Sequence, residues 1–127
     1  MKRVVGIGGV FFKSEDPKAL GAWYEKHLGV PVTPYGHAKF AWRREEDPEQ
    51  RGATVWKPFP RDTAYFAPSG ATLMINYIVD DLDALLAALR AEGVTVDEKR
   101  EESPFGKFGW AMDPEGNRIE LWEPPKK

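Results

Sequence analysis

The sequence contains no cysteine, which excludes disulfide bonds, CxxC redox chemistry and thiolate metal sites. It has no apolar run long enough to approach a membrane span. Its net charge of −2 gives neither the basic footprint of a nucleic-acid-binding protein nor an acidic excess that would predict a strongly cationic partner. We therefore expect a soluble cytoplasmic protein that binds neither nucleic acid nor membrane.

The length and composition are those of one globular domain. The chain has 127 residues, of which 42% are hydrophobic and 30% are charged, enough to bury a real core. The N-terminal run MKRVVGIGGVFF ends in charged residues and lacks a small-residue cleavage site, so it is predicted to be a first strand and not a signal peptide. Few Asn, Gln and Met beside many charged residues suggest a thermophilic source.

Two helices are predicted, one in each half of the chain. The first begins after Asp16, an N-cap followed by a proline at the first helical position, and stops at Gly29. The second begins after Asp80-Asp81 and stops at Gly93. Residues at helical spacing define the predicted core stripes, which are Leu20, Trp23, Tyr24, His27 and Leu28 in the first helix and Leu82, Leu85, Leu86 and Leu89 in the second.

These parallels amount to an internal repeat. Asp16 and Leu20 are separated from Asp81 and Leu85 by the same interval, which is close to half the chain. We predict a single domain, 1–127, made of two strand–helix–three-strand units, 1–69 and 70–127. The predicted strands are 4–13, 37–44, 54–58 and 63–67 in the first unit and 71–79, 96–101, 108–112 and 118–123 in the second, with a charged solvated loop at 43–52.

Three segments resemble the vicinal oxygen chelate superfamily, which includes glyoxalase I, bleomycin-binding proteins and extradiol dioxygenases. They are Asp16 through Trp23-Tyr24 to Leu28-Gly29, the run YIVDDLD at 77–83, and DPEGNRIEL at 113–121. The resemblance implies an α+β fold in which a tandem βαβββ repeat forms a curled, open, barrel-like mixed sheet with the helices outside. It also implies a homodimer. It does not specify an activity, because one scaffold hosts many chemistries.

Strand alternation predicts where Glu120 points. Arg118, Glu120 and Trp122 share one face of the last strand, opposite Ile119 and Leu121. The DPEGN turn pairs Trp110 with Glu120 and Phe108 with Trp122. In the strand before the second helix, Leu73, Ile75, Tyr77 and Val79 are predicted to pack on the leucine stripe. The opposite, concave face carries Met74, Asn76 and Ile78, and by the repeat Gly9 and Phe11. Glu120 is therefore predicted to point into a cup walled by Phe11, Met74, Phe108, Trp110 and Trp122.

The resemblance also implies four metal-ligand positions, which fall here on Gly9, Ala64, Met74 and Glu120. Only Glu120 can ligate a divalent ion, and one carboxylate does not hold such an ion against water. Of the two histidines, His27 is expected on or beside the core stripe, and His37 lies either at the cup rim or at a strand edge. We predict no metal and no cofactor.

An aromatic cup with a few polar groups describes a small-molecule pocket, although each ring can equally belong to the core. The expected ligand-binding residues are Phe11, His37, Met74, Asn76, Phe108, Trp110, Arg118, Glu120 and Trp122. Burial would raise the pKa of Glu120 unless Arg118 or Asn76 compensates. Glu120 is then either a functional group or a hydrogen-bonded fold residue that closes the last strand.

Two functions of different classes follow. The first is a metal-independent small-molecule-binding protein that takes a partly aromatic organic ligand in the cup. The alternative is a glyoxalase-like lyase or isomerase in which Glu120 is the catalytic base and Asn76, His37 or Arg118 polarises the substrate. A metal-dependent enzyme ranks third because its ligands are missing. Segment 103–109, with glycines around aromatics, is predicted to be a mobile lip over the cup.

Overall fold

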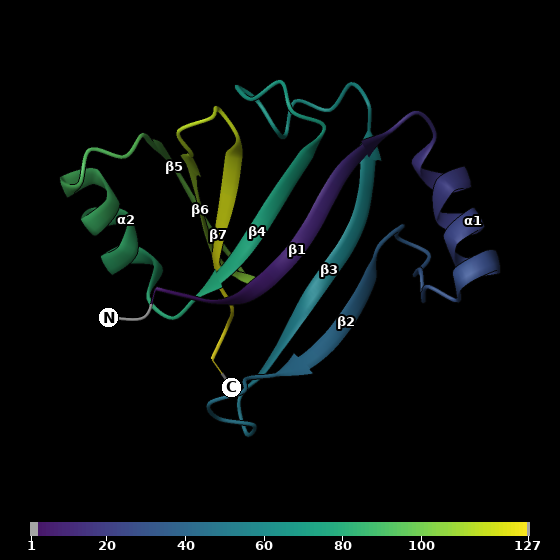
Figure 1. Ribbon diagram of the computed structural model, residues 1–127, viewed down its shortest axis with the longest axis horizontal. Coiled ribbons are helices and arrows are strands. Elements are labelled where there is room, and N and C mark those ends of the chain that lie inside the picture. Colours follow the sequence, from purple (N-terminus) through teal and green to yellow (C-terminus); the bar gives the residue numbers. More distant parts are fainter. Residues whose placement is uncertain (1–2, 127) are drawn as a thin grey trace.

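A computed structural model describes residues 3–126 and contains one seven-stranded sheet with two helices (Figure 1). The elements in chain order are β1 (Val4–Ser14), α1 (Pro17–Leu28), β2 (Ala38–Arg43), β3 (Arg51–Pro60), β4 (Leu73–Val79), α2 (Leu82–Ala91), β5 (Val96–Ser103), β6 (Gly106–Met112) and β7 (Arg118–Glu123). The strand order across the sheet is β2-β3-β1-β4-β7-β6-β5, and the sheet does not close. The predicted fold class is confirmed.

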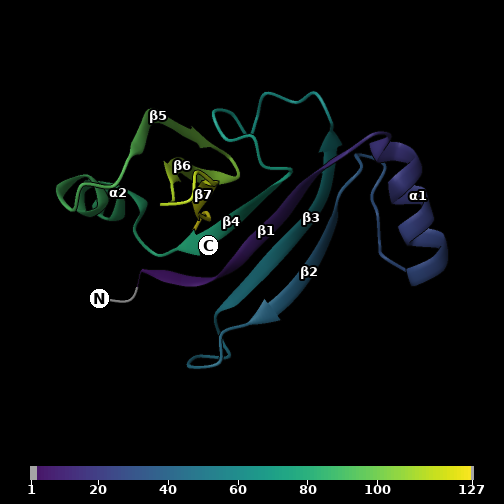
Figure 2. The ribbon, with the colours of Figure 1, turned by 45° about the horizontal axis from the view of Figure 1, so that its top comes forward.

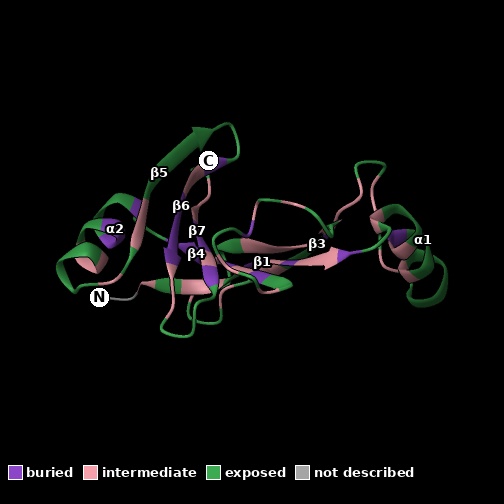
Figure 3. Cartoon of the chain, turned by 90° about the horizontal axis from the view of Figure 1, so that it is seen from above, coloured by how far each residue is buried: buried purple, intermediate pink, exposed green. Residues whose placement is uncertain are grey.

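The sheet consists of two similar halves that meet along one seam. In the first half β1 is parallel to β3, which is antiparallel to β2. In the second half β4 is parallel to β7, which is antiparallel to β6, and β6 is antiparallel to β5. The seam is the antiparallel pair β1–β4. The strands of the second half rise out of the plane of the first, so the sheet curls into a cup (Figures 2 and 3).

The first half has one strand fewer than predicted. Segment 63–67 is not a strand but a series of turns, closed by backbone bonds from Thr63 to Pro60, from Ala67 to Ala64 and from Ser69 to Phe66. Consequently β3 is the last strand of the first half and repeats β7, while β2 repeats β6. Nothing between α1 and β2 repeats β5. That stretch contains two prolines, which cannot donate to a strand ladder.

Helix α1 has the predicted ends but not the predicted stripe. The Asp16 side chain accepts a hydrogen bond from the Ala19 backbone N–H at 3.1 Å, and Gly29 ends the helix in the left-handed conformation. The helix lies at the far side of the first half (Figure 1) and contacts the sheet through Tyr24, whose ring lies 4.9 Å from that of Trp56. Trp23 and Leu28 are 51% and 63% exposed.

His27 is also exposed, and its ring lies 4.9 Å from that of Trp23. The prediction that it lies on or beside a core stripe is therefore wrong. The physical reason is that α1 covers only the end of a narrow half-sheet, so one line of its residues, and not a broad stripe, reaches the strands.

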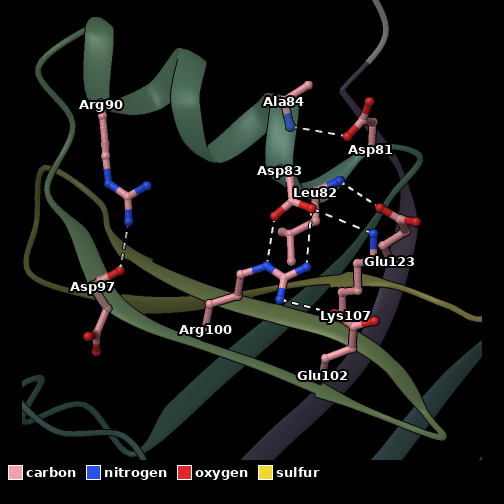
Figure 4. Close-up of polar contacts among 10 residues, drawn as sticks. All are labelled: Asp81, Leu82, Asp83, Ala84, Arg90, Asp97, Arg100, Glu102, Lys107 and Glu123. Carbon is pink, nitrogen blue, oxygen red and sulfur yellow. Dashed lines mark hydrogen bonds and ion pairs between the residues drawn. The ribbon is translucent and has the colours of Figure 1, made fainter.

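Helix α2 is anchored more firmly. Leu82, Leu85 and Leu86 form a buried cluster with Val79 and Leu121 on the convex face of the second half. Hydrogen bonds fix the start of the helix, where Asp81 accepts from the Ala84 N–H at 3.1 Å (Figure 4). Leu73, predicted to join this packing, lies beyond the helix and is exposed.

Charged contacts hold α2 to the strands beneath it (Figure 4). Glu123 of β7 accepts a hydrogen bond from the Leu82 N–H at 2.9 Å, and the Arg100 guanidinium of β5 holds both oxygens of Asp83, at 2.7 and 3.1 Å. Within residues 3–126 no helix is long and apolar enough to span a bilayer.

The segment predicted as a mobile lip is mostly part of the sheet. Gly106–Met112 forms β6, and only Pro104 and Phe105 lie in the turn between β5 and β6. The Trp122 Nε1–H donates to the Phe105 carbonyl at 2.7 Å and ties that turn to β7. The glycines that suggested mobility serve close packing instead, since a Cβ at Gly109 would meet Leu86 at 3.0 Å.

Candidate functional site

The concave face of the sheet gathers side chains from both halves. Across the seam Phe11 pairs with Met74 and Gly9 with Asn76, and in the second half Glu120 lies between Asn76 and Trp110. Partners directly opposite one another project on the same side of a sheet, so these residues share the cup. The pairing of Trp110 with Glu120 and of Phe108 with Trp122 agrees with the register predicted from the turn.

Glu120 is buried at the bottom of this cup, only 2% exposed. One carboxylate oxygen accepts a hydrogen bond from the Asn76 Nδ2–H at 2.5 Å. The other accepts from the Trp110 Nε1–H at 2.9 Å and from the Tyr65 hydroxyl. Glu120 is therefore an internal carboxylate held by three neutral donors, and not a solvated surface charge.

Burial raises the pKa of Glu120 above the ordinary value of 4.5. The hydrogen bonds from Tyr65, Asn76 and Trp110 and the positive charge of Arg118 act in the opposite direction, but they do not cancel the effect of burial. Burial and the nearby Glu120 charge likewise raise the pKa of the Tyr65 phenol. The Tyr65 phenol thus keeps its proton and donates it to Glu120 in a hydrogen bond, and a buried carboxyl whose pKa is raised is suited to accepting or releasing a proton.

Arg118 lies behind Trp110. Its guanidinium is 5.1 Å from the centre of the Trp110 ring and donates to Asp97 at 2.9 Å. A backbone hydrogen bond from Lys99, followed by that from Arg118, holds the pKa of Asp97 below its usual value. Arg118 therefore positions the Trp110 indole and acts on Glu120 only through its charge.

Asn76 depends on a glycine beside it. Its Oδ1 is buried and has no hydrogen-bond partner among the described residues. A Cβ at Gly8 would overlap this oxygen and would come within 2.9 Å of Trp122. The side-chain amide is therefore in close contact with bare backbone, which only glycine permits.

The other predicted site residues lie farther from the carboxylate. Phe108 and Trp122 stack with ring centres 5.9 Å apart. His37 is half-buried in the turn before β2, and its Nδ1 lies 3.4 Å from the Thr33 hydroxyl. Among the contacts of the described residues, none joins His37 to Glu120.

Sequence reasoning missed the segment that fills the cup. The loop between β3 and β4, residues 61–72, brings Tyr65 onto Glu120 and buries Phe66 beside Phe11, Met74 and Trp110. Tyr65 also stacks on Phe59, with ring centres 5.5 Å apart. The available signal is an aromatic pair flanked by turn-forming residues, and its composition alone predicts a strand.

The topology also corrects one of the four metal-ligand positions that the resemblance implied. In the second half Asn76 pairs with Glu120, and the equivalent pair in the first half is Phe11 with Lys57. The position that repeats Glu120 is therefore Lys57 and not Ala64, because β3 and not segment 63–67 is the last strand of its half.

The residues at these four positions do not fit a divalent ion. A lysine ammonium repels a cation, a methionine thioether is a poor ligand for hard ions, and glycine has no ligand. A Cβ at Gly9 would meet the Phe11 ring at 2.7 Å, so a longer side chain there has no room. Within the part of the chain that the structure describes, no group of three His, Asp or Glu side chains lies together as a metal site.

The sequence profile of the glyoxalase-like domain matches residues 9–122, nearly the whole chain. The chain belongs to the glyoxalase-like family. This places it in the vicinal oxygen chelate superfamily that the three segments indicated. Comparison with curated protein sequences gave no match.

Solved structures share the fold of this glyoxalase-like chain. A variant of methylmalonyl-CoA epimerase from Streptomyces coelicolor, in complex with 2-nitronate-propionyl-CoA, has a TM-score of 0.69 at 20% identity, over 97% of this chain and 99% of that chain. Methylmalonyl-CoA epimerase from Mycobacterium tuberculosis has a TM-score of 0.60 at 21% identity, over 97% and 90%. A glyoxalase/bleomycin resistance protein/dioxygenase superfamily member from Vibrio splendidus 12B01 has 0.57 at 11%, over 92% and 97%. At these identities the likeness concerns the fold alone.

Proposed function

We propose that the protein is a metal-independent small-molecule-binding member of the glyoxalase-like family, which takes a partly aromatic organic ligand in its cup. The observation that carries the proposal is the environment of Glu120, a buried carboxylate with three neutral donors among aromatic rings. Aromatic walls around a few convergent polar groups are the usual make-up of a small-molecule site. The residues at the four metal-ligand positions that the resemblance implied support the absence of a metal, because only Glu120 among them is a ligand for a divalent ion and Lys57 is a cation.

The loop 61–72 determines how a ligand reaches Glu120. Tyr65 places a phenol on the carboxylate from a segment that is held at its ends by turns and flanked by exposed Ala64 and Ala67. A ligand with an aromatic ring and a hydroxyl or amide N–H offers the same chemistry as that phenol. We therefore propose that the ligand displaces Tyr65 and donates its own hydrogen bond to Glu120.

A thermal-shift screen of phenols and aromatic amides tests this function. A ligand that binds only the folded state raises the unfolding temperature as its concentration exceeds the Kd. The variant Tyr65→Ala, which vacates the ring site, is expected to bind such ligands more tightly than the wild type, and Glu120→Gln more weakly. Equal binding by both variants and the wild type would locate the ligand elsewhere and contradict the proposal.

Metal content is the second measurement. Purified protein is expected to contain well under one equivalent of divalent ion, and added Zn²⁺, Ni²⁺ or Mg²⁺ should not raise the unfolding temperature. One equivalent of ion bound in the wild type and lost in Glu120→Gln would overturn the metal-independent assignment.

An enzyme remains the second candidate, supported by the raised pKa of Glu120. A carboxyl whose pKa is moved toward neutrality is suited to removing and returning a proton, as a lyase or isomerase requires. Some of the structural relatives are epimerases by name. Turnover of any ligand found by the screen, abolished in Glu120→Gln, would assign the enzyme and exclude a pure binding role.

The predicted homodimer, cytoplasmic location and thermophilic source also stand as proposals. The exposed apolar side chains Trp23, Phe40 and Leu73 support self-association, because large apolar groups in contact with water favour burial in an interface. Sedimentation analysis of the purified protein measures the oligomeric state, and a monomer at micromolar concentration would contradict the dimer.

A further inference from the structure

Charged residues are distributed unevenly over the sheet, although the overall charge is only −2. The sequences of β1, β2 and β3 contain no Asp or Glu but carry Lys13, Lys39, Arg43, Arg51 and Lys57. The strands of the opposite half carry charges of both signs, since the buried Glu120 and the acidic residues of β5 lie beside Lys99, Arg100, Lys107 and Arg118. The cations of the first half therefore differ in having no acidic residue on their own strands.

Three of these cations line up on the concave face of the first half. Lys39 of β2 pairs with Val55, and Lys13 of β1 pairs with Phe59. Lys57 lies between Val55 and Phe59 on β3, so all three positions project to the same side. They form a diagonal row across three neighbouring strands, each displaced by two residues along β3 from the last, which we call the lysine row.

The lysine row lacks counter-ions. None of the three ammonium groups has a hydrogen-bond or ion-pair partner within residues 3–126. Instead, the Lys57 Nζ lies 5.0 Å from the centre of the Phe59 ring and the Lys13 Nζ lies 5.5 Å from that of Phe66. An ammonium on a ring face is held more weakly than one in an ion pair, so these groups are available to an anion.

Lys57 occupies the position in the first half that Glu120 occupies in the second. The repeat has thus placed an ammonium and a carboxylate at equivalent points, with Phe11 and Phe66 between the two halves of the cup. The Tyr65-Phe66 loop contacts both sides, since Tyr65 bonds Glu120 and Phe66 lies under Lys13.

We propose that the lysine row is an anion-binding subsite and that the ligand is an organic acid. Its carboxylate or phosphate lies on Lys57 with Lys13 and Lys39 beside it, and its aromatic body lies over Phe59. Its uncharged donor group faces Glu120. This assignment rests on the proposed function and specifies the chemical class of its ligand.

4-Hydroxyphenylacetate and its neutral methyl ester test the subsite, because both carry the phenol that would donate to Glu120 and only the first carries a carboxylate. Binding is followed by tryptophan fluorescence and by backbone amide shifts in NMR. Wild-type protein is expected to bind 4-hydroxyphenylacetate about tenfold more tightly than the ester, as a charge-assisted contact requires. In Lys57→Met or Lys13→Met, which keep the apolar stem, the preference should fall to about twofold or less. Lys18→Met, on the exposed side of α1, is the matched control and should keep the full preference.

The outcomes separate the subsite from the proposed function. If the two probes bind equally to the wild type, or if the preference survives in Lys57→Met and Lys13→Met, the subsite is wrong and the cup remains a neutral-ligand site. Inorganic phosphate probes the lysine row alone and is expected to shift amides of β1, β2 and β3. If phosphate does so while the ester causes no shift in the cup, the subsite holds and the proposed function fails. If neither phosphate nor 4-hydroxyphenylacetate shifts these strands, the subsite is overturned.

Discussion

Replacing Glu120 by Gln should change how the stability of the protein depends on pH. In the unfolded chain the Glu120 carboxyl titrates near 4.5, whereas burial raises its pKa in the folded protein. Between these two values the folded state keeps the proton that the unfolded state has lost. The contribution of the protonated Glu120 carboxyl to stability is therefore fully present below pH 4.5 and is lost as pH rises through the pKa of the folded state.

The size of this loss follows from the balance of contacts around the carboxyl. Burial outweighs the three hydrogen bonds and the charge of Arg118, so the ionised carboxylate is less stable in the folded protein than the protonated carboxyl. A buried polar group that lacks sufficient partners typically costs about 1–3 kcal/mol, and we expect a loss of this order between pH 4 and pH 8. Glutamine cannot ionise, and turning the Asn76 amide would bring its unpaired Oδ1 to the new N–H donor.

Urea unfolding at pH 4, 5, 6, 7 and 8, followed by tryptophan fluorescence, measures the difference directly. The free energy of unfolding of Glu120→Gln should rise relative to that of the wild type as pH increases. Glu98→Gln, which removes an exposed carboxylate from β5, controls for the change in net charge. If the free energy of unfolding of the wild type instead rises relative to that of Glu120→Gln as pH increases, the three donors outweigh burial and the reasoning about the proton is refuted.

Three further substitutions test the contacts around the cup and at one helix end. Tyr65→Phe removes a donor to Glu120 and should lower the free energy of unfolding by about 1–3 kcal/mol in urea, and no loss would show that the phenol is dispensable. Gly8→Ala should cost roughly 1–3 kcal/mol, since its methyl group overlaps the Asn76 amide, and a neutral result would mean that Asn76 moves freely. Asp81→Ala removes the N-cap of α2 and should lower the melting temperature through a loss of about 1 kcal/mol, whereas an unchanged value would show that other contacts suffice.

The features that the sequence predicted well depend on local chemistry. Helix ends follow from the caps Asp16 and Asp81, and the pairing of Trp110 with Glu120 follows from counting outward from a short turn. Alternation then places Glu120 on the concave face, because a strand has only two faces. These inferences need no knowledge of distant parts of the chain.

The features that it predicted poorly depend on contacts between distant residues. Tyr65 and Phe66 have the composition of a strand, but they gain more by entering the cup, where Tyr65 meets a carboxylate 55 residues away. The position that repeats Glu120 was misassigned for the same reason, because the register of Lys57 follows from the pairing of β3 with β1. No local pattern reveals which segment will fill a hollow formed by the rest of the fold.

The open sheet leaves two terminal strands, β2 and β5, whose outer edges lie at the ends of the strand order. Unpaired edges are templates for strand addition and aggregation unless charge or shape prevents it. From Glu98 to Ser103 every residue of β5 is polar and exposed (Figure 3). A strand from another chain that paired with this edge would therefore come against charged side chains. β2 has only Lys39 and Arg43 as charges beside the exposed Phe40, so this edge is less well protected against strand addition than that of β5.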